Sequence, residues 1–142
     1  MFYIHRTNNT QELKSHLVNL FRVAGIDGKI SRDEFELLFV QSRKLGFSDQ
    51  DLAKITAYDQ EEVLNIPDSL EERVQHLFDL VCMVVADHKI DHREILLCQK
   101  IAESYGIGQD KVEQLIGKLV IASSNHALSE TFLADVEQLL KA

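Results

Sequence analysis

An internal repeat is the feature of this 142-residue chain that most constrains its fold. When the sequence is aligned with itself at an offset of 60 residues, positions 16–55 match positions 76–115 without a gap. A helical unit this short cannot bury its apolar face alone. We therefore expect two related helical hairpins that pack together around a pseudo-twofold axis. The pairs of identical residues include His16 and His76, Asp27 and Asp87, Lys29 and Lys89, Ile30 and Ile90, Glu34 and Glu94, and Gly46 and Gly106.

Apolar residues recur at three- and four-residue spacing along almost the whole chain, as in Leu13, Leu17, Leu20 and Phe21. Strand-like alternation is not sustained beyond the first few residues. The sequence therefore predicts an all-α fold, a single-domain helical bundle of about seven to eight helices built from the two repeats. The expected helices lie near 10–25, 32–45, 49–57, 60–65, 70–86, 92–105, 109–122 and 130–141.

One domain is expected over 1–142, because one proline and six glycines leave no room for a long flexible linker. Its expected parts are repeat 1 at about 10–57, an acidic connector at about 58–69, repeat 2 at about 70–122 and a C-terminal helix at about 130–141.

Residues that can cap helices stand where the apolar periods begin. Ser31 with Glu34, and Asp91 with Glu94, have the spacing of a capping box, in which each side chain bonds the backbone N–H of the other residue. The same or nearly the same spacing occurs in Asn9 with Glu12, Ser48 with Asp51, and Ser69 with Glu72. Gly46 and Gly106 each follow an apolar residue at the end of a period and are expected to stop a helix.

The net charge of −8 is concentrated in one segment. Residues 49–72 hold eight acids and one lysine, a net charge of −7, whereas the other residues hold 15 acids and 14 bases, a net charge of −1. No basic stripe is visible, so nucleic acid is not an expected partner.

The apolar run from Leu80 to Ala86 is far shorter than the ~20 residues that span a bilayer, and the N-terminus lacks the apolar core of a signal peptide. We expect a soluble, cytoplasmic protein with no direct membrane insertion. Cys82 and Cys98 lie in apolar surroundings without CxxC spacing, so we expect them to be reduced core residues.

Both repeats carry the motif Asp-x-Lys-Ile-x-x-x-Glu in the loop between their helices, at Asp27 to Glu34 and at Asp87 to Glu94. It matches only the second half of an EF-hand calcium loop, and the residues at the first and third ligand positions, Val23 and Gly25 in the first copy, offer no side-chain oxygen. An ordinary EF-hand is therefore excluded. Two alternatives stay open: the acids cap helices and loop amides, or they form a functional acidic site.

The duplicated pattern, clearest from Ala24 to Glu34, resembles the TerB-like family of tellurite-resistance proteins, whose domain also occurs beside the J-domain of DjlA-like co-chaperones. The resemblance covers about 16–116. It implies an all-helical cytoplasmic domain of a bacterial stress response, without established catalysis, with divalent-metal binding by acidic residues and association with membrane-bound partners. The second copy departs from the family motif at His88, where the first copy has Gly28. No His-Pro-Asp tripeptide is present, so the chain has no J-domain of its own.

The candidate metal ligands are the motif acids and their neighbours in the second loop. Mixed nitrogen and oxygen donors of this kind suit zinc or another transition ion, whereas carboxylates alone suit calcium, magnesium or manganese. The alternative is a solvated loop, because the spacing of His88 and His92 does not guarantee a common face. For His16 and His76, packing at a helix border is favoured over ligation. The candidate ligands are Asp27, Glu34, Asp87, Glu94, Asp91 and His88.

No glycine-rich phosphate loop, nucleophile elbow or HExxH motif is present, so no catalytic residue is proposed and the expected protein is not an enzyme. The sequence favours a TerB-like domain that binds a divalent metal ion (Ca, Mg, Mn or Zn) or a protein partner, such as a membrane-associated complex, through an acidic face. The alternative is a structural interaction scaffold with no metal, whose groove between the repeats accepts a partner helix. Exposed apolar residues between the repeats would favour the alternative.

Overall fold

The computed structural model describes residues 10–26, 28–51, 53, 66–86, 90–124 and 130–141, and within them all regular secondary structure is helical. The predicted all-α class is therefore confirmed. The helices are α1 (Thr10–Ala24), α2 (Arg32–Lys44), α4 (Leu70–Val85), α5 (His92–Ser104), α6 (Val112–Ser123) and α7 (Glu130–Lys141). Residues 49–51 and 53 are helical as well.

The six named helices begin and end close to their predicted positions, with one exception, and residues 54–57 of the helix expected at 49–57 lie outside the described residues. The helix expected from residue 109 begins at Val112, because Gly108 to Lys111 form a turn closed by a 2.8 Å hydrogen bond from the Lys111 N–H to the Gly108 carbonyl. The helix expected at 60–65 lies outside the described residues.

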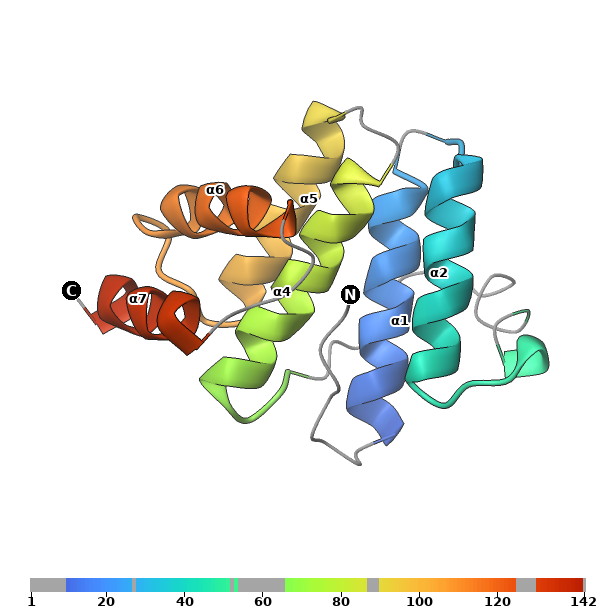
Figure 1. The fold of residues 1–142 in the computed structure, drawn as a ribbon, viewed down its shortest axis with the longest axis horizontal. Helices are drawn as coiled ribbons and strands as arrows, with labels where there is room; N and C mark the ends of the chain where they lie inside the picture. Colours follow the sequence, from blue (N-terminus) through green and yellow to red (C-terminus); the bar gives the residue numbers. More distant parts are fainter. Residues whose placement is uncertain are drawn as a thin grey trace.

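Helix α4 is the centre of the fold. It contacts α1, α2, α5 and α6, and Figure 1 shows it between the α1–α2 pair on one side and α6 on the other. Residues 74–81 are buried without interruption, which means that this helix is covered all round rather than along one stripe. Such burial explains why α4 contains the longest strongly apolar run of the sequence.

Buried apolar side chains from all six named helices form one core. Leu17 and Leu20 of α1, together with Leu77 and Leu80 of α4, are completely buried there. The two leucines of each helix occupy repeat-equivalent positions, and α1 packs directly on α4. Helix α7 contributes one fully buried side chain, Val136, and several half-buried ones.

The predicted capping box at the start of α2 is confirmed. The Glu34 N–H donates to Ser31 Oγ at 3.1 Å, and the Ser31 N–H donates to Glu34 Oε1 at 3.0 Å. Ser48 and Asp51 form the same reciprocal pair, at 3.1 and 2.9 Å. Both boxes satisfy backbone donors that a helix leaves unpaired at its N-terminus.

The other caps differ in detail. Ser69 Oγ accepts from the Glu72 N–H at 3.1 Å, as the spacing predicts. At the start of α5, Asp91 accepts a hydrogen bond from the Arg93 N–H at 2.8 Å. Its short carboxylate reaches the second residue of the helix, so the predicted cap at Asp91 is present.

Gly46 and Gly106 end α2 and α5 in the same way, as predicted. Each has a positive φ, 90° and 87°, which glycine adopts without steric penalty. In each case the glycine N–H and the next N–H bond back to carbonyls three and five residues earlier, at 2.9 to 3.1 Å. This pattern is a Schellman motif, completed by the apolar residues Phe47 and Ile107.

No helix among the described residues is long and apolar enough to cross a membrane.

Candidate functional site

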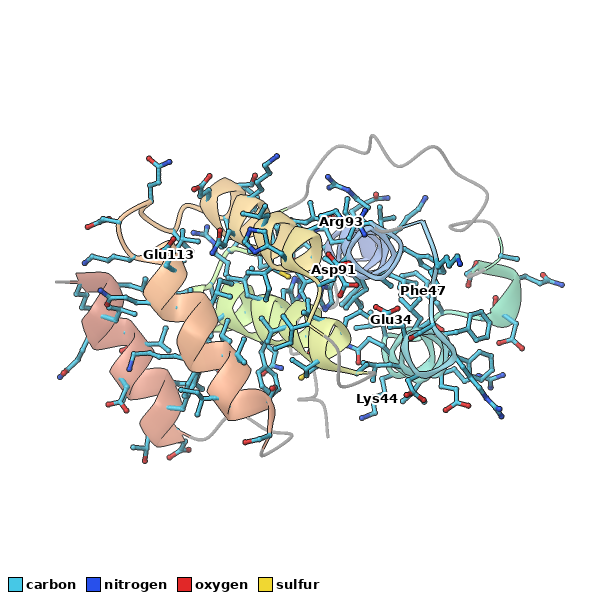
Figure 2. All side chains as sticks on the ribbon, turned by 90° about the horizontal axis from the view of Figure 1, so that it is seen from above. Glu34, Lys44, Phe47, Asp91, Arg93 and Glu113 are labelled. Carbon is cyan, nitrogen blue, oxygen red and sulfur yellow. The ribbon has the colours of Figure 1, made fainter. Side chains whose placement is uncertain are left out.

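The helix ends that flank the two motif loops meet at one end of the molecule, the loop end. Figure 1 shows the last turns of α1 and α4 and the first turns of α2 and α5 together at the top of the bundle, and Figure 2 looks down on this end. Three of the predicted metal ligands, Asp27, Asp87 and His88, lie outside the described residues. Glu34, Asp91 and Glu94 are described, and each lies in or beside the first turn of a helix.

The described acids of this end have structural roles. Glu34 is 2% exposed and completes the capping box of α2. Asp91 caps α5 and also pairs with the Arg93 side chain, whose Nη2 lies 3.1 Å from Asp91 Oδ2. Hydrogen bonds from the Arg93 side chain and backbone lower the pKa of Asp91. Figure 2 shows the two residues side by side at the start of α5.

Glu94 is buried at the third position of α5, 4% exposed. Burial, and after it the charge of Glu94, raises the pKa of the neighbouring Cys98 thiol. Among the described residues, no three histidine, cysteine or acidic side chains come together in a way that could hold a metal ion.

A second polar cluster lies in the core, around Asp79 of α4. This carboxylate is completely buried and forms hydrogen bonds with side chains of three helices. His16 Nε2 lies 2.8 Å and Gln41 Nε2 3.1 Å from Asp79 Oδ2, while Gln75 Nε2 lies 3.3 Å from Oδ1. The side-chain amides of Gln41 and Gln75 donate to the carboxylate, and His16 Nε2 donates to it in the tautomer that carries its proton on that nitrogen.

The repeat-equivalent histidines stack on each other within this cluster. The rings of His16 and His76 lie parallel, with centroids 3.9 Å apart, and both side chains are completely buried. The Tyr105 ring lies beside His76, with centroids 6.4 Å apart. The prediction that the two histidines pack is confirmed, but they pack in the core rather than at a helix border.

Asp79, Gln41 and Gln75 were not among the residues singled out from the sequence. The available signal was that Asp79 follows His76 by three residues beside the longest strongly apolar run of the sequence, where a charged residue needs a partner. At the equivalent position of the first copy the chain has Asn19, which is also buried.

A groove of about 570 Å³ opens at the loop end between the two repeats. Its apolar lining includes Ile26, Ile30 and Phe35 of the first repeat, which are 41%, 37% and 52% exposed, and Leu97 of α5. Ile30 and Phe35 have the spacing of a hydrophobic staple, which accounts for their proximity but not for their exposure. Phe21, Gly25 and Arg22 complete the lining.

The groove residues differ between the two repeats. Gly25, on the groove wall, corresponds to Val85, and Arg22 corresponds to Cys82. The open space and the positive charge are therefore features of the first copy and do not follow from the shared motif.

The cysteines are poor candidates for chemistry. Both are free, Cys98 is buried, and burial raises the pKa of each thiol to about 12. A thiol that keeps its proton at neutral pH is a weak nucleophile and a weak metal ligand. This agrees with the prediction that they are reduced residues of the core.

Comparison with protein-family models, with curated proteins and with solved structures finds no match for this chain.

Proposed function

We propose that this chain is a non-enzymatic, TerB-like helical domain that binds a protein partner through the groove at its loop end. The observation behind this proposal is the exposure of Ile26, Ile30 and Phe35 in one groove between the repeats. Large apolar side chains exposed together are typical of a protein-binding surface. A cytoplasmic location and a membrane-bound partner, which the family resemblance implies, belong to the same proposal.

The partner-binding alternative is preferred to the metal-binding one because the described acids of the two motifs already have structural roles. Glu34 and Asp91 bond to helix N-termini, and Asp91 is also paired with Arg93. Metal binding at the loops then depends on Asp27, Asp87 and His88, and it stays a prediction. Calorimetric titration with calcium, magnesium, manganese and zinc tests it, and heat that disappears in the double variant Asp27→Ala, Asp87→Ala would support it.

The proposal includes the duplication of one helical hairpin, with α1–α2 and α4–α5 related by a pseudo-twofold axis between α1 and α4. Three kinds of observation support it. Gly46 and Gly106 end equivalent helices with the same Schellman motif. His16 and His76 stack on each other, as equivalent residues at an axis do. The helix ends that flank the motif loops of both copies meet at one end of the bundle.

The groove is tested with a displayed library of short amphipathic helical peptides, selected against the folded chain. Selected peptides are expected to lose most of their affinity for Phe35→Asp, because a carboxylate then lies among the apolar contacts. Aspartate is tolerated in the first turn of α2, near the positive end of the helix dipole. The matched control is Ile121→Asp, which changes a 74% exposed apolar residue on α6 and is expected to leave binding unchanged. Peptides that bind both variants equally well would contradict the proposed function.

A further inference from the structure

Arg22 is the charged residue of the groove lining, and a buried side chain of the same helix binds its guanidinium. Its Nη1 donates to Asn19 Oδ1 at 3.2 Å, and the Asn19 side chain is 2% exposed. Because Asn19 is buried in the core, this bond holds the half-buried Arg22 side chain at the wall of the groove.

No acidic side chain among the described residues forms an ion pair with Arg22. The other arginines near this end differ in this respect, because Arg32 pairs with Glu36 and Arg93 pairs with Asp91. A guanidinium has five N–H donors in a planar fork that matches a carboxylate. Among the described residues, Arg22 uses one of them on a neutral amide, Asn19, and the other donors of the fork suit the carboxylate of a ligand in the groove.

The form of the ligand follows from what the groove offers. All regular structure among the described residues is helical, so there is no sheet edge in this part of the chain to which an extended strand could add. A single arginine is not the arginine cluster that phosphopeptide recognition uses. An open apolar groove between helices is the surface that receives the apolar face of an amphipathic helix.

Resting on the proposed function, we propose that the groove binds an amphipathic helix of a partner protein that carries an aspartate or glutamate beside its apolar stripe, and that Arg22 binds this carboxylate. The apolar side chains of the helix, at spacings of three and four residues, pack on Phe35, Ile30 and Leu97. The charge-assisted bond to Arg22 then fixes the register and direction of the helix.

The test applies the same peptide selection to the wild-type chain and to Arg22→Glu. The wild-type chain is expected to enrich peptides with an acidic residue at one fixed position relative to the apolar stripe. Arg22→Glu is expected to enrich lysine or arginine at that position. For a wild-type peptide, Arg22→Gln and replacement of the peptide acid by its amide should each weaken binding roughly tenfold, and the two changes together little more than either alone.

Two controls keep the outcomes distinct. Lys118→Glu makes the same charge change at an exposed site on α6 and is expected to leave the selection unchanged. Circular dichroism shows whether each Arg22 variant is folded. If Arg22→Glu does not fold, Arg22→Gln carries the test, because it keeps an amide donor and adds no charge. Peptides that require Phe35 but show no acidic preference and bind Arg22→Gln normally would overturn this inference alone. Peptides that do not require Phe35 would overturn the proposed function with it.

Discussion

At the scale of single residues, the buried polar side chains around Asp79 connect three helices and were not predicted from the sequence. The carboxylate joins α1, α2 and α4 through His16, Gln41 and Gln75. The separation between His16 and Asp79 is 63 residues, so no local pattern encodes their contact. The equivalence of His16 and His76 was visible in the sequence, but the contact of His16 with Asp79 could be recognised only from the three-dimensional arrangement of the helices.

Replacing Asp79 by alanine is expected to lower the free energy of unfolding by about 3–5 kcal/mol, because it leaves buried donors without their acceptor. Urea denaturation followed by circular dichroism measures the change. Asp135→Ala, at an exposed position in the middle of α7, serves as the control and should change stability by less than about 0.5 kcal/mol. A loss below about 1 kcal/mol for Asp79→Ala would mean that the cluster contributes little to stability.

At the scale of helices, the ends of the elements were predicted well because they depend on residues close in sequence. The box of Ser31 and Glu34 and the glycine stops at Gly46 and Gly106 appear as expected. The start of α6 was misplaced because Lys111 provides no side-chain cap and a backbone turn sets the boundary instead. The spacing of residues along the chain predicts a helix start that a side chain caps. It does not predict a start that a backbone turn sets, as before α6.

The capping box gives a matched pair of variants on one helix. Glu34→Ala removes the acceptor of the Ser31 N–H and is expected to reduce stability by about 1 kcal/mol. Glu36→Ala removes an exposed acid two residues later, whose partner Arg32 is also exposed, and should have a much smaller effect. Thermal denaturation of the two variants checks the difference, and equal melting temperatures would show that the box is not stabilising.

At the scale of the whole molecule, burial controls the response to alkaline pH. Desolvation raises the pKa of Cys82 and Cys98 from 9.0 to about 12, and that of Tyr105 from 10.0 to about 12. The folded protein therefore keeps protons that the unfolded chain releases as the pH rises above 9. Because the unfolded state then binds fewer protons, stability must fall with increasing pH in this window.

We expect the free energy of unfolding to decrease between about pH 9 and about pH 12, with a slope of up to about 1.4 kcal/mol per pH unit for each of the three groups. Urea denaturation at a series of pH values measures the slope. Cys98→Ala removes one titrating group, so its curve should be shallower than that of the wild-type chain, whatever its stability at neutral pH. Parallel curves would contradict the assigned shift of Cys98.

The groove illustrates what the repeat could not predict about the whole molecule. Its apolar lining combines residues of the first loop with Leu97 of the second repeat, and its charge comes from Arg22, which the second copy replaces with Cys82. The repeat predicted which helices pair, but the surface proposed to bind a partner depends on positions where the copies have diverged.

Asn19 and Asp79, at equivalent positions of the sequence repeat, are both buried but have different partners. Two identical subunits must place every charge near their axis twice, whereas two copies within one chain can differ there. In the duplication that we propose, the chain holds an acid at one position and an amide at the other. The acid receives His16, and the amide holds Arg22. Equivalent positions in one chain can in this way serve the interior and the groove separately.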